Sequence, residues 1–187
     1  MRIISGFFKG KKILEPKDKE TRPLKDLTKE SIFNIINHSN KFSISLDGSN
    51  VLDLFCGTGS FGLECLSRKA RKVTFIENYE HILPILKKNL LNLTSASNYE
   101  IIEKDILNSS EITNLNQKFD IIFLDPPYKE NDMTKLLDLI IKTKVLKNDG
   151  IIIIHRHKKK IDIFPNSFKI IEEKIYGISK IIFGTYY

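Results

Sequence analysis

The sequence predicts an α/β fold in which a mostly parallel β-sheet is covered by helices on both faces. Short apolar runs alternate along the chain with segments of helical periodicity, a pattern typical of strand–helix–strand units. The last twenty residues instead hold two apolar runs joined at residues 176–179, which predicts a hairpin and one antiparallel strand at the sheet edge. With 187 residues, 41% of them hydrophobic, the chain is long enough for one domain with a sizeable core.

The N-terminal region is expected to form a β-hairpin followed by a helix. The stretch "RIISGFFKGKKIL" reads as two short strands around Gly6 and Gly10, so we assign residues 1–20 to a hairpin extension and 21–187 to the main domain. Apolar side chains at helical spacing then predict the first helix, with Pro23 just before it and Asp26 or Thr28 as its cap. The apolar positions are Leu24, Leu27, Ile32, Ile35 and Ile36.

Eight further segments complete the alternation before the terminal hairpin. Strands are expected at "NVLDLF", "KVTFIE", "YEIIEKD", "FDIIFLD" and "GIIIIH", which makes seven with the hairpin. Helices are expected at "SFGLECLSR", "HILPILKKNLLNL" and "MTKLLDLIIKTKVL". Pro84 has no amide hydrogen to donate, so it must lie in the first turn of its helix or kink it.

Composition narrows the classes of function. The net charge of +7 favours a polyanionic partner, although a lysine-rich composition can also raise it. No apolar run approaches a membrane span, and the N-terminus lacks a signal-peptide core, so we expect a cytoplasmic protein. Cys56 and Cys65 are too few for a disulfide framework or a zinc site. His155 and His157, in "HRHKKK", are interpreted as a solvated basic edge that could touch phosphates, and no metal site is expected.

Carboxylates stand at the ends of four successive predicted strands. Asp53, Glu77, Asp105 and Asp125 each occur at or near such an end. Because the carboxyl ends of parallel strands meet at one edge, and ligands of open α/β sheets bind there, the four acids predict a lined site.

A glycine-rich loop follows the first of these acids. Gly57, Gly59 and Gly62 match G-x-G-x-x-G between a strand and a helix, a pattern that lets a ligand approach the backbone. Glu77, twenty residues after Gly57, can accept hydrogen bonds from ribose hydroxyls. Asp53 precedes the loop in D-x-F-x-G-x-G, where an acid suits a ligand with an ammonium group better than a pyrophosphate. The loop therefore predicts a nucleoside-containing cofactor that carries positive charge.

These motifs resemble those of a known class of enzymes. "VLDLFCGTGSFGLECLSR", "FIENYE", "EKDI" and "LDPPY", in this order, resemble S-adenosylmethionine-dependent methyltransferases of the Rossmann-like class. The N-terminal "MRIISGFFKGKKIL" and "TRPLKDLTKESIFNII" extend the resemblance over nearly the whole chain to the RsmD-type 16S ribosomal RNA guanine-N2 methyltransferases. The chain departs from that family's pattern at Leu24 and Leu27, and in "HRHKKK", where the family usually has an acid.

The resemblance implies a cofactor, a substrate and a cellular partner. S-adenosylmethionine would be bound by Asp53, Gly57, Gly59, Glu77, Asp105 and Ile106, with Phe55 either beside the cofactor or in the core. Asp105 can accept a hydrogen bond from the adenine amino group. The substrate would be the exocyclic N2 amine of a guanine in 16S ribosomal RNA, within a 30S subunit or assembly intermediate, and the enzyme a monomer.

The D-P-P-Y stretch is expected to carry the chemistry. An exocyclic amine attacks a methyl sulfonium only after its delocalised lone pair is freed, and two acceptors on its N–H groups favour that change. Asp125 and the carbonyl of Pro126 can supply them, while Pro126 and Pro127 hold both rigidly. Tyr128 offers a face for stacking on an extruded base. Whether Asp125 takes the proton or only orients the amine stays open at this point.

Basic residues near the N-terminus are expected to bind the RNA. They are Arg2, Lys9, Lys11 and Lys12 on the predicted hairpin, together with Arg22, which could instead touch the cofactor. Two other functions remain open. An adenine-N6 methyltransferase acting on DNA or RNA would use D-P-P-Y equally well, whereas a Rossmann nucleotide-binding module or small NAD-dependent oxidoreductase would leave D-P-P-Y unexplained.

Overall fold

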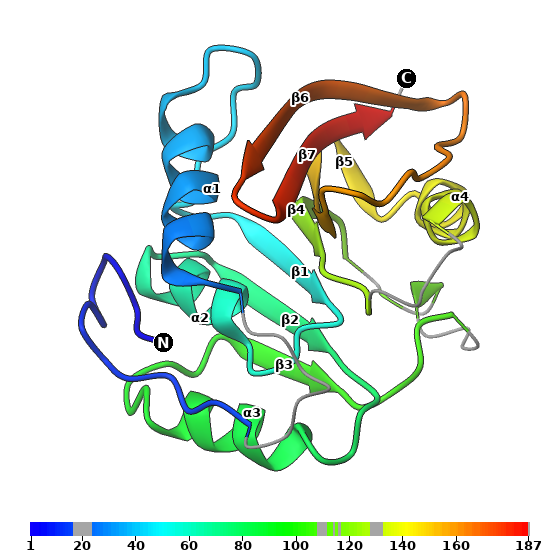
Figure 1. The fold of residues 1–187 in the computed structure, drawn as a ribbon. Helices are drawn as coiled ribbons and strands as arrows, with labels where there is room; N and C mark the ends of the chain where they lie inside the picture. The colour runs from blue at the N-terminus through cyan, green and yellow to red at the C-terminus, as the bar shows by residue number, and fades with distance from the viewer. Residues whose placement is uncertain (17–23, 108–111, 114, 116, 128–132, 187) are drawn as a thin grey trace.

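A computed structural model of the chain describes residues 1–16, 24–107, 112, 113, 115, 117–127 and 133–186 (Figure 1). Its helices are α1 (Asp26–His38), α2 (Ser60–Ser67), α3 (Leu83–Leu91) and α4 (Met133–Thr143). Its strands are β1 (Asn50–Leu54), β2 (Lys72–Ile76), β3 (Tyr99–Ile102), β4 (Phe119–Leu124), β5 (Leu146–His157), β6 (Phe168–Tyr176) and β7 (Ser179–Tyr186).

The strands form one seven-stranded sheet in the order β3-β2-β1-β4-β5-β7-β6. Strands β1 to β5 are parallel, and β7 pairs antiparallel with both β5 and β6. The expected α/β class, the seven strands and the antiparallel pairing at one edge are confirmed. The antiparallel strand β7 lies one place inside that edge, because its hairpin partner β6 is the outermost strand.

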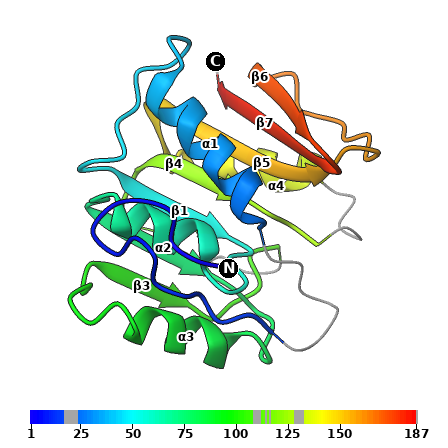
Figure 2. The same cartoon turned by 60° about the vertical axis from the view of Figure 1, so that its left-hand side comes forward.

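Two apolar layers cover the sheet (Figures 1 and 2). The inward faces of α1, α2 and α3 pack on one face through buried residues such as Phe33, Phe61 and Leu86. Helix α4 packs on the other face through Met133, Leu136, Leu137 and Ile140. Alternate residues of β1, β4 and β5 enter the two layers, as the pleat of a β-strand requires.

Helix termini differ in part from the sequence prediction. Pro84 lies in the first turn of α3, as required for a residue without an amide hydrogen. Neither expected cap of α1 acts as one: the N-cap is Lys25, without a side-chain hydrogen bond, and Asp26 is the first helical residue. An acid in the first turn still interacts favourably with the helix dipole, which explains why the pattern resembled a cap.

The N-terminal segment folds back on itself and packs against α2 and α3 (Figure 2). Arg2 and Lys12 form an isolated antiparallel bridge, so the expected hairpin is short and irregular. Its Ile4 and Ser5 amides donate to the two carboxylate oxygens of Glu64 at 2.8 and 2.9 Å. Glu64 is itself buried beside the buried ammonium of Lys29, at 3.6 Å. Buried polar groups with partners of this kind hold the segment in one place.

No helix in the described part of the chain has the length and apolar character needed to cross a membrane. This finding agrees with the absence of a long apolar run in the sequence.

Candidate active site

The register of the parallel strands aligns their carboxyl ends. Leu54 at the end of β1 lies opposite Ile76 of β2 and Leu124 of β4. Ile154 of β5 lies opposite Leu124 in turn. The next residues along these strands, Glu77, Asp125 and His155, therefore follow in one row along the edge. Asp105 does not join the row, because β3 ends at Ile102 and Asp105 lies in the loop beyond it.

The glycine loop turns sharply between β1 and α2. Phe55, Gly57 and Gly59 all have positive φ, at 57°, 55° and 79°. Glycine adopts such angles without strain, whereas Phe55 does so at a cost. Gly62 serves a different purpose: a Cβ there would lie 2.2 Å from the ring of Phe75, so the glycine permits close packing of α2 on β2. The motif thus combines a tight turn at Gly57 and Gly59 with close helix–sheet contact at Gly62.

Asp53 is a buried carboxylate with unused acceptor capacity. Its Oδ2 accepts a hydrogen bond from the amide of Gly62 at 2.9 Å, while Oδ1 has no partner among the described residues. Burial raises the pKa of Asp53 well above its usual range, and the negative charges of Asp125 and Glu77 raise it further against the Gly62 hydrogen bond. An orphaned buried acceptor is costly to the protein alone and suits a ligand that brings a donor or positive charge.

Glu77 connects the glycine loop to the end of β2. Its Oε2 accepts from the Gly57 amide at 2.7 Å, and its Oε1 accepts from the Asn78 and Tyr79 amides at 3.0 and 2.9 Å. A carboxylate has about four acceptor positions, so these three bonds leave capacity for one ribose hydroxyl. Glu77 therefore stabilises the conformation of the glycine loop. It also lies at the end of β2, where the sequence predicted an acceptor for a ribose hydroxyl.

The other three predicted cofactor residues differ in exposure. Asp105 is half-buried, and its Oδ1 accepts from the Leu107 amide at 2.9 Å. The side chain of Ile106 is buried in the apolar layer shared with α4, so only its backbone is suited to meet a ligand. Phe55 packs at the margin of the same layer. These positions leave the predicted cofactor roles as predictions.

Asp125 immediately follows β4, which lies between β1 and β5 in the sheet, so Asp125 is inside the row. Its amide donates to the Leu54 carbonyl at 3.3 Å, which fastens it to the strand that leads into the glycine loop. Its side chain is 23% exposed, and its Oδ1 lies 2.8 Å from Nδ1 of His155. Pro126 is buried and Pro127 exposed, while Tyr128 lies outside the described residues.

The expectation that "HRHKKK" forms a solvated edge is wrong for its first two residues. His155 is only 7% exposed, and its Nε2 lies 2.9 Å from the hydroxyl of Ser179 on β7. Arg156 is buried on the other face of β5 and bonded to Asp162 at 2.8 Å. Pairing of β5 with β7 buries both side chains, whereas Lys158 and Lys159 beyond the strand end are exposed as expected.

The predicted RNA-binding residues of the N-terminal segment do not all lie together, because only Arg2 and Lys12 are bridge partners. Lys9 is exposed at the tip, where the Phe7 and Phe8 amides bind Ser67 at the far end of α2. Because α2 has eight residues, about 12 Å of helix separates this tip from the glycine loop. Lys11 is half-buried and donates to the Asn92 carbonyl at 2.7 Å.

Arg2 and Lys12 are exposed and lie nearer the candidate site. The Arg2 carbonyl accepts from Lys29, whose ammonium also reaches Ser60 at the start of α2. The same stretch continues to Leu14, which is bonded to Asn89, a residue that also contacts Thr58 of the glycine loop. Arg22 lies outside the described residues.

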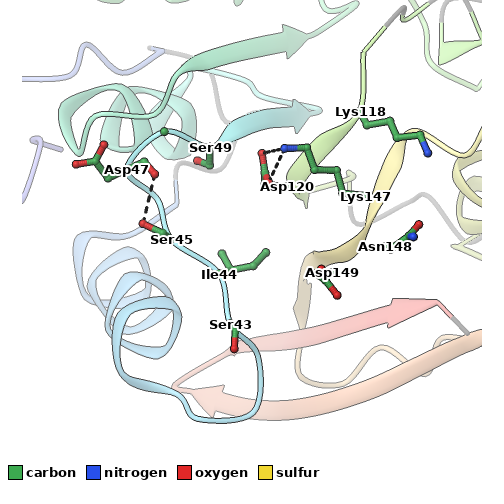
Figure 3. Close-up of a pocket in the computed structure, with 11 residues that line it drawn as sticks. Ser43, Ile44, Ser45, Asp47, Ser49, Lys118, Asp120, Lys147, Asn148 and Asp149 are labelled. Atoms are coloured by element: carbon green, nitrogen blue, oxygen red, sulfur yellow. Dashed lines mark hydrogen bonds and ion pairs between the residues drawn. The ribbon is translucent and has the colours of Figure 1, made fainter.

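A separate depression lies at the opposite, amino ends of β1, β4 and β5 (Figure 3). It is lined by residues 43–45, 47–49, 118, 120 and 147–149. The Lys147 ammonium is bonded to both oxygens of Asp120 at 2.8 and 2.9 Å, and the Asn50 amide also donates to Asp120. These groups satisfy one another, and their position matches none of the predicted site residues.

Cys56 and Cys65 are free thiols buried near the loop and in α2. Burial raises the pKa of both thiols well above the usual value, helped by the charge of Asp53. Neither is therefore suited to act as a thiolate, and both pack in the apolar core.

Sequence reasoning missed His155 and Ser179, the two residues whose side chains continue the hydrogen-bonded chain from Asp125. The signal for His155 was present, because it directly follows the apolar run "GIIII" at the same edge as the acids. For Ser179 no local signal exists, because its contact with His155 depends on the antiparallel register in which His157 lies opposite Ser179.

Comparisons with known proteins show which family this sequence and fold resemble. The family model described as conserved hypothetical protein 95 matches residues 1–185. The ribosomal RNA small subunit methyltransferase D of Haemophilus influenzae is 34% identical over 95% of this chain and 90% of its own. The enzyme of the same name from Buchnera aphidicola subsp. Acyrthosiphon pisum is 34% identical over 92% and 86%.

Among solved structures, a proposed methylase of Haemophilus influenzae is 33% identical, covers 98% of this chain and 96% of its own, and has a TM-score of 0.75. Both the sequence matches and the fold therefore span nearly the whole chain. This chain belongs to the conserved hypothetical protein 95 family, the family of RsmD-type ribosomal RNA small subunit methyltransferases.

Proposed function

We propose that this protein transfers a methyl group from S-adenosylmethionine to the exocyclic N2 amine of a guanine in 16S ribosomal RNA. The observation that carries the proposal is the position of Asp125. It stands at the sheet edge, bonded through its amide to the residue that precedes the glycine loop, with a rigid diproline after it. The names of the family relatives supply the class of RNA.

The residues present fit this cofactor. The unpartnered Oδ1 of Asp53 can accept from the ammonium of the methionine part, and the remaining capacity of Glu77 can accept from a ribose hydroxyl. The positive-φ turn at Gly57 and Gly59 lets the ligand approach the backbone. S-adenosylmethionine supplies a methyl group activated by its sulfonium.

The protein's task is to make the guanine amine a nucleophile. The Asp125 carboxylate and the Pro126 carbonyl each accept a hydrogen bond from one of the two N–H groups of the amine. These hydrogen bonds favour a tetrahedral nitrogen with a free lone pair. The nitrogen forms the new bond to carbon as the carbon–sulfur bond breaks, and that electron pair stays on sulfur. One proton then leaves the nitrogen to Asp125 or to water. Tyr128 stacks on the base in this proposal, and Ile106 and Phe55 border the cofactor.

The RNA partner is a 30S subunit or an assembly intermediate in the cytoplasm, bound by a monomer of this chain. Arg2 and Lys12 are the basic residues best placed to contact phosphates near the candidate site, with Lys9 farther away. Arg22 remains a proposed contact to RNA or cofactor, and residues 1–20 remain a proposed extension of the 21–187 domain.

Nucleoside mass spectrometry tests the proposal. We expect 30S subunits from cells that lack this enzyme to gain N2-methylguanosine after incubation with wild-type protein and S-adenosylmethionine. The Asp125→Ala protein serves as the inactive control. Appearance of N6-methyladenosine instead would favour the adenine-N6 alternative, and no methylation of RNA at all would contradict the proposal.

A further inference from the structure

A hydrogen-bonded chain of three side chains joins the residue after β4 to β5 and β7 at the candidate active site. Asp125 Oδ1 lies 2.8 Å from His155 Nδ1, and His155 Nε2 lies 2.9 Å from Ser179 Oγ. His155 and Ser179 are each only 7% exposed, whereas the Asp125 side chain is 23% exposed. The buried imidazole of His155 therefore contacts the carboxylate of Asp125 from the protein interior, and the rest of that carboxylate faces solvent.

The three side chains lie on the same face of the sheet. Residues 123 on β4, 153 on β5 and 181 on β7 all belong to the apolar layer covered by α1, α2 and α3. Because side chains alternate with a period of two, Asp125, His155 and Ser179 point to that same side. Asp53 on β1 points to the same side, because it is two residues from Val51 of the same apolar layer.

We propose that His155 is a positioning residue that holds the Asp125 carboxylate for the substrate amine. Its Nδ1–H donates to Oδ1, which fixes the carboxylate plane and leaves Oδ2 as the acceptor for the amine. Ser179 holds the other ring nitrogen, so the imidazole cannot rotate without losing a buried hydrogen bond. The inference deepens the proposed function and rests on the role given there to Asp125.

The same contact makes the rate depend on pH. The charged groups that act on His155 are Asp125 from β4 and Arg156 from its own strand, while β7 contributes the hydroxyl of Ser179, which does not titrate. Burial lowers the pKa of His155, but the charge and hydrogen bond of Asp125 outweigh it and raise the pKa above its ordinary value of 6.5. An imidazolium draws electron density from the carboxylate, so Asp125 accepts better once His155 is neutral.

Two substitutions separate the two contacts of the ring. The amide nitrogen of Asn reaches roughly the position of Nδ1, so His155→Asn keeps a donor to Asp125 but cannot titrate. The amide of Gln reaches roughly the position of Nε2, so His155→Gln keeps the contact to Ser179 and gives up the donor to Asp125. His157→Asn, two residues along the same strand, is the matched control.

Single-turnover methylation of 30S RNA from pH 5.5 to 9, with saturating RNA and cofactor, gives the kinetic test. We expect the wild-type rate to rise with pH through the His155 titration, with a midpoint above 6.5. His155→Asn should keep the rate within about fivefold of wild type and lose the step. His155→Gln should be about 10- to 100-fold slower, by analogy with residues that orient metal ligands. His157→Asn should retain both rate and step.

Nuclear magnetic resonance of the four histidine rings tests the contact without turnover. We expect the His155 ring, identified by its loss in His155→Asn, to titrate above its ordinary value in wild type and lower in Asp125→Asn. A wild-type rate and pH profile in His155→Gln, or an unchanged titration in Asp125→Asn, would overturn the inference. Full activity of Asp125→Ala would instead overturn the proposed function, so the two failures can be told apart.

Discussion

The two ends of the central strands both carry acidic side chains but pair them differently. At the amino ends, Asp120 is bonded to the Lys147 ammonium and to a backbone amide (Figure 3). At the carboxyl ends, no described lysine or arginine forms an ion pair with Asp53, Glu77 or Asp125. Their partners are backbone amides and an imidazole.

We interpret this difference as an indication of which end binds a ligand. The amino end has the visible depression, yet one of the acids that line it, Asp120, is already paired with the Lys147 ammonium, which links β4 to β5. At the carboxyl end, the described residues leave the buried Oδ1 of Asp53 without a hydrogen-bond donor, which costs stability in the free protein. A ligand with an ammonium group would offset that cost, so we expect the ligand at the carboxyl end although the depression lies at the amino end.

The largest expected effect comes from removing the acid at the reacting end. Asp125→Ala should lower the single-turnover methylation rate by about 100- to 1,000-fold, the usual cost of losing a preorganised acceptor. Cofactor affinity should hold, because the proposed partner of Asp125 is the amine. Asp120→Ala is the control at the other end and should leave the rate unchanged. A wild-type rate for Asp125→Ala would contradict the assignment of the reaction to the carboxyl ends of the strands.

Asp125→Asn sharpens the role of this carboxylate. An amide oxygen can still accept one hydrogen bond but is a far weaker base. If orientation of the amine is the main role, the Asn variant should keep measurable activity, whereas a rate as low as that of Asp125→Ala would assign proton removal to Asp125. Rates of the two variants on the same 30S preparation make this distinction.

Tyr128 is tested in the same assay. Stacking requires the ring and not the hydroxyl, so Tyr128→Phe should be mild and Tyr128→Ala severe, with about 1–3 kcal/mol of base stacking lost. If Tyr128→Ala were as fast as Tyr128→Phe, the proposed stacking role of Tyr128 would be excluded.

The next effect concerns cofactor binding. Glu77→Ala should weaken S-adenosylmethionine binding by roughly 1–3 kcal/mol, the cost of losing hydrogen bonds to a charged group. Because Glu77 also holds the Gly57, Asn78 and Tyr79 amides, the value should fall toward the upper end of that range. Isothermal titration calorimetry measures it, with Glu100→Ala, an exposed strand residue paired with Lys72, as the control. An unchanged dissociation constant would exclude the ribose role.

Asp53→Asn should raise the stability of the free protein and weaken its binding of the cofactor. The raised pKa of folded Asp53 means that the folded state holds its proton to higher pH than the unfolded state, so this group lowers stability as pH rises above about 4. At pH 7 the Asn variant, which cannot ionise, should therefore be more stable than wild type in urea unfolding without cofactor. It should also bind the cofactor more weakly. A less stable variant at neutral pH would contradict this account of the orphaned oxygen.

The smallest effects are expected for the N-terminal basic residues. Combined replacement of Lys9, Lys11 and Lys12 by Ala should lower RNA affinity and reduce the salt slope by about one unit per lost phosphate contact. The structure ranks the single variants: Lys12→Ala should change the slope more than Lys9→Ala, which lies at the far end of α2. Lys11→Ala should also cost stability, because its ammonium is bonded to Asn92. If every variant had the same salt slope as wild type, the basic residues of this segment would not contact RNA phosphates, and the segment would have only a structural role.

The local parts of the site were determined by the sequence itself. Strand and helix periods follow from backbone geometry, so the five parallel strands and the helices between them could be predicted from apolar spacing. The positions of the glycine loop, Glu77 and Asp125 could also be predicted, because they depend on strand ends and on a turn that only a few residue types can adopt. The exception was Asp105, whose strand ends three residues earlier than expected.

Only the tertiary structure decided what surrounds these residues. The insertion of β7 between β5 and β6 buries His155 and Arg156, which by composition belong to a basic surface run. It also brings Ser179 to the imidazole, and folding of the N-terminal segment onto α2 buries Lys29 beside Glu64. Periodicity cannot report these facts, because burial, pairing and pKa depend on neighbours distant in sequence, and strand order leaves no mark on the local pattern.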